Sequence, residues 1–174
     1  MPEKILISAQ EIRKRVGELG KQITADFEGR DLLCVGILRG AFVFLADLVR
    51  QIAVPVEVEF IRCSSYRDRT VSSGQVEIEL AKEPAKFSER AVLVVDDILD
   101  AGWTLKNVRE ELLRRGAAEV RTCVLLDKPS RRATPFEADY IGFTIDNHFV
   151  VGYGMDCGER YRNLPFIAAL EGAR

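Results

Sequence analysis

Asp96, Asp97 and Asp100 are the side chains most suited to bind a polar ligand, because they directly follow an apolar run at residues 92–95. Such a run of valine and leucine is typical of a parallel strand that is covered on both faces. Adjacent carboxylates are costly to bury without partners. We therefore expect the strand to end at Asp96 and the pair to face a crevice at the carboxyl end of a sheet, where ribose hydroxyls, a cation or Mg²⁺ would satisfy it.

A glycine-containing turn joins this strand to a stretch with helical spacing. The turn and the first helical residues are Ala101, Gly102, Trp103 and Thr104. Free N–H groups and the positive end of the helix dipole make such a turn a phosphate cradle, with Gly102 allowing close approach and Thr104 adding a hydroxyl. In the alternative interpretation, Asp100 only caps the helix and the aspartate pair lies on a solvated loop.

Residues 92–105 resemble the phosphoribosyl-pyrophosphate (PRPP) signature of type I phosphoribosyltransferases, which has an apolar strand, two acids, two aliphatic residues, an aspartate and a Thr-Gly-x-Thr turn. The resemblance implies that Asp96 and Asp97 bind ribose hydroxyls and Mg²⁺. It makes Asp100 the catalytic general base or proton acceptor at purine N7. The implied PRPP- and nucleotide-binding residues are Asp96, Asp97, Asp100, Ala101, Gly102, Trp103 and Thr104. Ala101 departs from the usual Thr or Ser, so we expect weaker PRPP binding with the fold unchanged.

Two loops resemble those of hypoxanthine-guanine phosphoribosyltransferases. Arg39 and Gly40 stand where that family binds pyrophosphate, although Arg39 replaces the common lysine. A guanidinium still binds an anion, and can do so bidentately; the alternative is an exposed arginine at a helix start. The polar segment 64–74 is too long for a tight hairpin. It indicates a mobile lid, with Ser65 and Tyr66 closing over the reacting centre, or else a disordered connector.

The same resemblance implies a purine site. Lys128 would donate to O6 of a 6-oxopurine and so reject adenine; the alternative is a solvated lysine at a strand end. Phe149 would stack on the base, and backbone groups of Val150 and Asp156 would bind its edge. The Asp156 carboxylate would share the Mg²⁺ with Asp96 and Asp97, partly through water. Arg162 would bind pyrophosphate, or else is an ordinary surface arginine.

The implied reaction is displacement of pyrophosphate from C1 of PRPP by N9 of hypoxanthine or guanine, which gives IMP or GMP with Mg²⁺ as cofactor. Two alternatives remain open: a xanthine-guanine phosphoribosyltransferase, and a PRPP-responsive RNA-binding regulator that shares the signature. The net charge of −2 and the pI near 5.6 argue against a nucleic-acid partner.

Composition predicts one cytoplasmic domain over residues 1–174, because 47% of the residues are hydrophobic and the four cysteines are widely scattered. No run approaches the ~20 apolar residues of a membrane span, and no charged-then-apolar leader begins the chain. Neither export nor membrane insertion is expected. Relatives of this kind imply a homodimer or homotetramer.

The pattern of elements predicts an α/β fold with a mostly parallel, twisted sheet flanked by helices. Ser8 and Glu11 form a capping box for a first helix. Strands are expected near 32–38, 56–62, 76–80, 91–95, 120–126 and 139–145, and further helices near 41–53 and 104–115. The second and third strands would form an antiparallel edge hairpin. The resemblance adds a small hood built from both ends of the chain.

Overall fold

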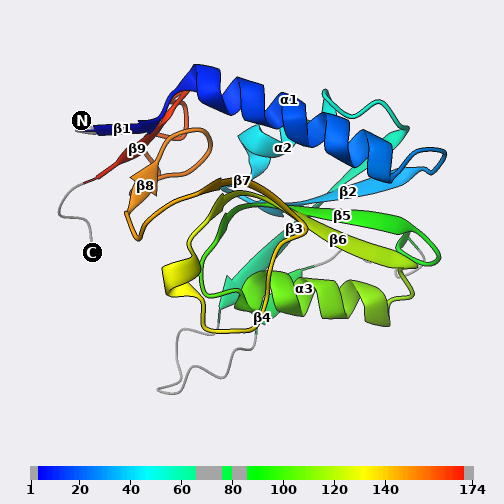
Figure 1. Cartoon of the computed structure of the whole chain (residues 1–174). Coiled ribbons are helices and arrows are strands. Elements are labelled where there is room, and N and C mark those ends of the chain that lie inside the picture. Colours follow the sequence, from blue (N-terminus) through cyan, green and yellow to red (C-terminus); the bar gives the residue numbers. More distant parts are fainter. Residues whose placement is uncertain (1–3, 66–75, 80–85, 171–174) are drawn as a thin grey trace.

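The computed structural model describes residues 4–65, 76–79 and 86–170. Within these residues a six-stranded sheet forms the centre of the molecule (Figure 1). Its strands, in spatial order, are β4 (Val76–Glu79), β3 (Val56–Ser65), β2 (Leu32–Leu38), β5 (Ala91–Leu99), β6 (Glu119–Asp127) and β7 (Tyr140–Thr144). All neighbouring pairs are parallel except β3 and β4. The predicted mostly parallel sheet with an antiparallel edge hairpin is confirmed.

Helices cover both faces of this sheet. α1 (Ala9–Asp26) and α2 (Phe42–Val49) lie on one face, and α3 (Trp103–Arg114) lies on the other (Figure 1). Alternate residues of a strand point to opposite faces. Accordingly, Leu93 of β5 joins the core under α1 and α2, whereas Val94 joins the core under α3. No helix in the described ranges is long and apolar enough to cross a membrane.

The first helix begins as its sequence predicts. The Ser8 backbone N–H donates to Glu11 Oε2 at 2.8 Å, and the Glu11 N–H donates to Ser8 Oγ at 3.3 Å, which completes the capping box. The residues of its buried face recur at helical spacing and are Ile12, Val16, Leu19, Gly20 and Ile23. Of the four free cysteines, Cys34 and Cys123 are buried as expected.

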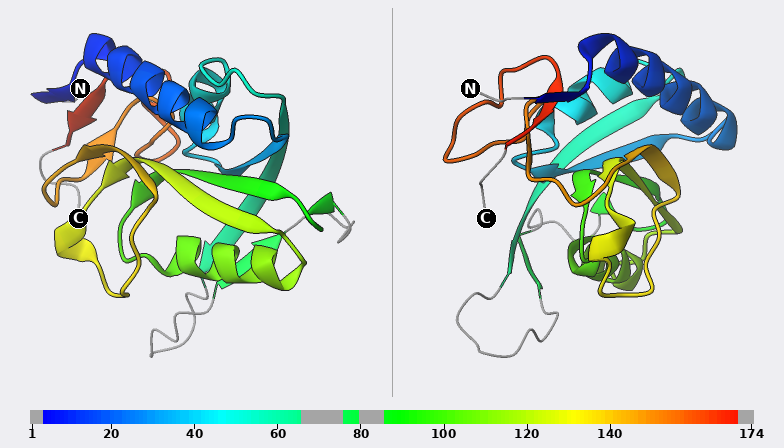
Figure 2. Two further views of the ribbon diagram at one scale, coloured as in Figure 1. Left: turned by 45° about the vertical axis from the view of Figure 1, so that its right-hand side comes forward. Right: turned by 60° about the vertical axis from the view of Figure 1, so that its left-hand side comes forward.

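A second, smaller sheet joins segments from the beginning and the end of the described chain. Its order is β1 (Lys4–Ile7), β9 (Ile167–Ala169) and β8 (Val150–Val151), with antiparallel neighbours. Figure 2 shows this sheet set to one side of the large sheet. Ile167 and Ala168 are fully buried, so β9 is the packed centre of this unit.

Three predicted boundaries were wrong. The strand expected near 56–62 continues to Ser65, because β4 pairs with it from Arg62 to Ser65. β5 continues beyond Asp96 to Leu99, because β6 keeps pairing with it until Leu99 lies opposite Asp127. A continuing parallel neighbour satisfies the backbone, so the side-chain charge of Asp96 does not end the strand. The helix expected near 41–53 ends at Val49 instead. The N–H groups of the next residues make tighter three-residue bonds, such as that from Gln51 to the Leu48 carbonyl at 2.9 Å.

Candidate active site

Two loops and the end of a strand meet at the carboxyl end of the large sheet. Gly40 follows β2, Asp97 lies near the end of β5, and Gly154 follows β8 of the small sheet. A Cβ atom on Gly40 would lie 1.7 Å from Asp97 Oδ2, and one on Gly154 would lie 2.3 Å from the Gly40 carbonyl oxygen. Only glycine permits this approach at both positions. The structure therefore brings together two segments that the sequence assigned to one site.

Asp96 and Asp97 form a carboxylate pair that is largely withdrawn from water. Asp96 is only 8% exposed. Burial raises the pKa of Asp96 well above its ordinary value, and the neighbouring Asp97 charge raises it further. Burial likewise raises the pKa of Asp97, while hydrogen bonds and the Arg162 charge oppose the shift. A cation or sugar hydroxyls would favour the ionised form of this pair, which agrees with the predicted role.

The carbonyl groups of the turn after β5 accept hydrogen bonds from the segment at residues 128–133. The carbonyls of Leu99, Asp100 and Ala101 accept hydrogen bonds from the Lys128 N–H (3.0 Å), Arg132 Nη1 (2.6 Å) and the Ala133 N–H (3.0 Å), respectively. Within the described residues, the N–H groups of positions 101–104 have no protein acceptor. Gly102, at φ +93°, is the N-cap of α3 and provides no side-chain bond. The turn is thus an open array of donors at a helix N-terminus, which suits an anion.

Asp100 does not cap α3, so the alternative interpretation of this residue was wrong. Its Oδ1 atom accepts a hydrogen bond from Arg131 Nε at 3.1 Å, and about half of its side chain is exposed. The carboxylate therefore lies at the entrance of the turn, where it remains open to a ligand.

Lys128 is buried, with 7% exposure, and is not the solvated strand-end lysine of the alternative interpretation. Its Nζ atom donates to the His148 carbonyl at 2.7 Å. Burial lowers the pKa of Lys128, although the charges of Asp100 and Asp97 oppose this shift. These effects place the ammonium group within electrostatic reach of the carboxylates of the turn.

The residues predicted to hold a purine lie beside this lysine on the small sheet. Phe149 follows His148 directly and is 41% exposed, so its ring is available for stacking. Val150 is buried in β8 opposite Ala169. The Phe149 carbonyl accepts a hydrogen bond from the Leu170 N–H at 2.9 Å, which fixes the backbone at the edge of the sheet.

An ion-pair network joins the two arginines predicted to bind pyrophosphate. Arg162 contacts Asp156 Oδ1 at 2.8 Å and donates to the Gly154 carbonyl at 2.8 Å. Arg39 contacts Glu159 Oε2 at 3.0 Å, and that same oxygen lies 3.3 Å from Arg162 Nη2. Glu159 was not identified from the sequence. Its signal is weak, because its partner Arg39 lies 120 residues away.

Two further predictions concern the lid and the metal site. Ser65 ends β3 opposite Val76, and Tyr66 lies outside the described residues, so their role as a lid stays a prediction. No cluster of three or more acids, histidines or cysteines in the described ranges could hold a metal ion alone. Asp96, Asp97 and Asp156 thus do not form a complete cage. A Mg²⁺ ion here would also need oxygens from substrate and water, which is its usual coordination in phosphate sites.

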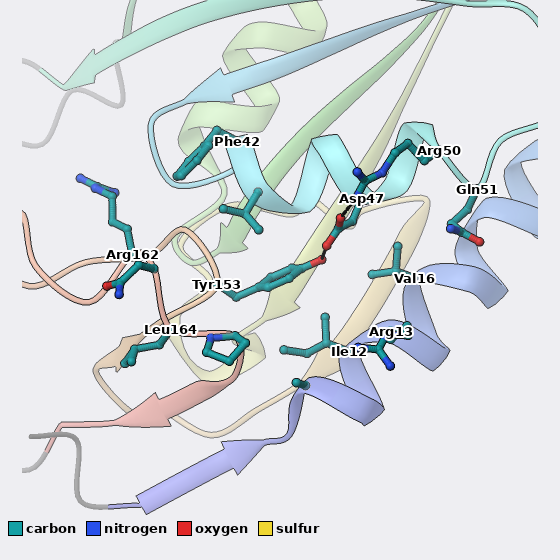
Figure 3. A pocket seen from close by; sticks show the side chains of 14 residues that line it. Ile12, Arg13, Val16, Phe42, Asp47, Arg50, Gln51, Tyr153, Arg162 and Leu164 are labelled. Carbon is teal, nitrogen blue, oxygen red and sulfur yellow. Dashed lines mark hydrogen bonds and ion pairs between the residues drawn. The ribbon is translucent and has the colours of Figure 1, made fainter.

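A cavity of about 850 Å³ lies beside this site and was not expected from the sequence. It is bounded by α1, α2 and the loop that carries Tyr153 and Arg162 (Figure 3). The Tyr153 hydroxyl donates to Asp47 Oδ2 at 2.6 Å across this space. Burial raises the pKa of Tyr153, and the bond to Asp47 raises it further. Arg162 lines the cavity and also belongs to the network above, so the two regions share a wall.

Comparison with known proteins identifies the family to which the chain belongs. The model of the phosphoribosyl transferase domain matches residues 4–157. The chain is 43% identical to the hypoxanthine-guanine phosphoribosyltransferase of Bacillus subtilis, covering 98% of this chain and 94% of the relative. It is 46% identical to the enzyme of the same name from Streptococcus pneumoniae, with coverages of 97% and 93%.

A longer relative and a solved crystal structure show the same family similarity. The bifunctional protein TilS/HprT of Listeria innocua is 46% identical over 97% of this chain, but the chain spans only 26% of that relative's length. A crystal structure of a hypoxanthine-guanine phosphoribosyltransferase from Bacillus anthracis superposes with a TM-score of 0.92 at 40% identity, covering 98% and 99% of the two chains. The chain therefore belongs to the phosphoribosyltransferase family and, within it, to the hypoxanthine-guanine phosphoribosyltransferases.

Proposed function

We propose that this protein acts in purine salvage, transferring the 5-phosphoribosyl group of PRPP to N9 of hypoxanthine or guanine, with IMP or GMP and pyrophosphate as products. The observation that carries the proposal is the open donor array at positions 101–104, adjacent to a carboxylate pair in which Asp96 is buried and Asp97 is half-buried. A buried ammonium group at Lys128 lies within electrostatic range of Asp97 and Asp100. These are the groups that a phosphate, a ribose and a 6-oxopurine require.

The phosphoribosyl half is held by the large sheet. The turn and the Thr104 hydroxyl bind the 5′-phosphate, while Asp96 and Asp97 bind the ribose hydroxyls and thereby orient C1. Arg39, the Gly40 loop and Arg162 bind pyrophosphate, and their positive charge stabilises it as it leaves. To do so, the arginines must exchange Glu159 for the anion.

The base lies between the two sheets. Lys128 donates to O6, Phe149 stacks on the ring, and backbone groups of Val150 and Asp156 bind the edge. A 6-amino group offers Lys128 no acceptor, so adenine would leave one N–H donor of this buried ammonium group without a partner, beside the one bonded to the His148 carbonyl. Asp100 accepts the proton at purine N7. A carboxylate is a weak base in water, so positioning and exclusion of water by a lid at Ser65 and Tyr66 increase its effect.

The donor set fits a Mg²⁺ ion shared with the substrate. Asp96 and Asp97 are hard oxygen ligands whose ionised form a cation would favour, and Asp156 offers a further carboxylate near Arg162. The ion would neutralise charge on the departing pyrophosphate.

The proposal is tested by supplying PRPP and Mg²⁺ with hypoxanthine, guanine, xanthine, adenine and uracil in parallel, and measuring nucleotide formation. Turnover with hypoxanthine or guanine, and not with adenine or uracil, is expected. Preferential turnover of xanthine would favour a xanthine-guanine enzyme. Absence of turnover together with salt-sensitive RNA binding would replace the proposal by the regulator.

We also infer where the protein acts and how it assembles. The chain acts in the cytoplasm as a single domain over residues 1–174, without nucleic-acid or membrane partners, and β1, β8 and β9 form its hood. It assembles as a homodimer or homotetramer. Sedimentation at micromolar concentration tests the assembly, and a monomer alone would contradict it.

A further inference from the structure

We propose that Arg132 is a positioning residue for the phosphate-binding turn, which it holds open by fastening the Asp100 carbonyl to the end of β6. This inference rests on the proposed function, since it assigns Arg132 to the same site. It adds a residue that neither the sequence motifs nor the implied substrate contacts include.

The contacts of the Arg132 guanidinium are divided between two elements. Nη1 donates to the Asp100 carbonyl at 2.6 Å, and Nη2 forms an ion pair with Asp127, the last residue of β6. The side chains of Arg132 and Asp127 are 17% and 9% exposed. A guanidinium is a rigid fork, so fixing one arm on Asp127 also fixes the direction of the other. The ion pair thereby holds the guanidinium in place to bind the turn.

The position of the bonded carbonyl explains why this contact matters. The Asp100 carbonyl is the middle one of the three consecutive carbonyls that all point to segment 128–133. It is also the only one of the three, among the described contacts, that no backbone N–H binds; the Ala101 carbonyl accepts from the Thr134 hydroxyl at 3.5 Å in addition to its backbone donor. If this group turned away, the peptide N–H of Ala101 would turn with it and leave the donor array. Arg132 therefore controls the orientation of one phosphate-binding N–H without touching the phosphate.

Packing behind the turn supports the same role. A Cβ atom on Gly102 would lie 2.6 Å from Thr134 Oγ1 and 3.3 Å from Arg132 Cδ. Segment 132–134 thus lies directly against the back of the turn. Arg132 does not contact the predicted base-binding residues in the described part of the chain. A defect in its position should therefore affect the phosphate half of the site and spare the base.

The primary test compares wild type with Arg132→Gln. We expect the KM for PRPP and the Kd for IMP to rise about tenfold or more, as for a lost charged hydrogen bond, with the KM for hypoxanthine changed less than about twofold. Arg132→Lys, which keeps the charge but lacks the fork, should recover only part of this loss. Unchanged PRPP KM and IMP Kd in Arg132→Gln would overturn the proposal.

A loss of stability must be separated from a loss of positioning, because Arg132→Gln leaves Asp127 buried without its partner. The double variant Asp127→Asn with Arg132→Gln removes that uncompensated charge. It should regain thermal stability while retaining the raised Kd for IMP; recovery of both would overturn the proposal. Arg121→Gln is the matched control. Arg121 lies in the same strand as Asp127 and contacts Glu119 at 2.6 Å, so the variant should lower stability without changing the Kd.

The binding readout separates this inference from the proposed function. If wild type binds IMP but forms none from PRPP, the proposed function fails, and a raised Kd in Arg132→Gln still supports the positioning role. If wild type is active and Arg132→Gln binds IMP as tightly as wild type, the positioning role alone fails.

Discussion

Asp100 lies in the turn after β5, and its charge acts on the buried Lys128, so its replacement is the most direct test at the scale of a single residue. Asp100→Asn keeps the shape of the side chain and removes its basicity. We expect kcat to fall by about 10²- to 10⁴-fold, as for loss of a general base, with the Kd for IMP little changed. Steady-state kinetics and calorimetry measure the two quantities.

The matched control for this change is Asp31→Asn, an exposed aspartate before the amino end of β2. It should leave both kcat and Kd as in wild type. An Asp100→Asn enzyme that turns over at the normal rate would remove Asp100 from the catalytic role.

Ala101 is the one position where the PRPP signature lacks a hydroxyl. Its backbone is already held, since the Ala101 carbonyl accepts from the Ala133 N–H at 3.0 Å. We therefore expect Ala101→Thr to add a donor without moving the turn and to lower the KM for PRPP by about tenfold. Initial rates at varied PRPP measure this. An unchanged KM would mean that the backbone donors and Thr104 suffice.

Lys128 predicts a dependence on pH, because burial lowers its pKa below the ordinary 10.5. Between the lowered pKa and 10.5 the unfolded chain binds a proton that the folded chain has released, so the free energy of unfolding contributed by this group rises with pH. Binding of the base should instead weaken as the pH rises, because Lys128 loses the ammonium donor that binds O6.

Measurement of the KM for hypoxanthine from neutral to alkaline pH tests this expectation. The KM should rise in wild type as Lys128 loses its proton and stay flatter in Lys128→Arg, which remains charged. Parallel profiles in the two proteins would assign the effect to another group.

The sequence was informative where a residue's role depends on its neighbours along the chain. Asp97, Gly102 and Phe149 could be proposed as site residues from local patterns and the resemblance. Glu159 and Arg132 could not, because their roles arise from partners distant in sequence. The Arg39 and Glu159 pair spans 120 residues, and the Arg132 bond to the Asp100 carbonyl spans 32. Local periodicity contains no information on such pairs.

At the scale of elements, the close contact between the Gly40 loop and β5 predicts that a larger side chain at Gly40 lowers activity. A Cβ on Gly40 would lie 1.7 Å from Asp97 Oδ2, so Gly40→Ala must displace that carboxylate or the loop. A displacement near 1 Å can cost about a hundredfold in rate, and we expect kcat/KM to fall by that order.

Gly17→Ala in α1 is the control for this glycine change, because its nearest neighbour, Gln51 Oε1, would be 3.9 Å away. It should raise the free energy of unfolding by about 1 kcal/mol with kcat/KM unchanged, since alanine is the better helix former. Equal activity of Gly40→Ala and wild type would contradict the proposed contact between loop and strand.

Element boundaries show what local patterns omit. The hydrophobic run predicted the existence of β5, but its end depended on how far β6 continued to pair with it. The capping box of α1, by contrast, is complete within four consecutive residues and was predicted correctly. Boundaries set by a partner strand therefore escape sequence reasoning, while those set by local hydrogen bonds do not.

At the scale of the whole molecule, the proposed site joins two sheets whose described strands do not pair with one another. Lys128 follows β6 of the large sheet, and its Nζ bond to the His148 carbonyl at 2.7 Å ties it to the segment that leads into β8. A ligand that spans both sheets should therefore stabilise both, whereas a ligand confined to the turn should stabilise only the large one.

Hydrogen exchange with two matched ligands tests this expectation. Ribose 5-phosphate lacks the base and should slow amide exchange in the turn at 100–104 while leaving β8 and β9 unchanged. IMP adds the purine, so it should protect the turn together with β8 and β9, because stacking on Phe149 orders the small sheet. In Phe149→Ala, IMP should still protect the turn but lose most of its effect on the small sheet. Protection of β8 and β9 by ribose 5-phosphate alone would show that the sheets are coupled without the base, and would contradict a purine site between them.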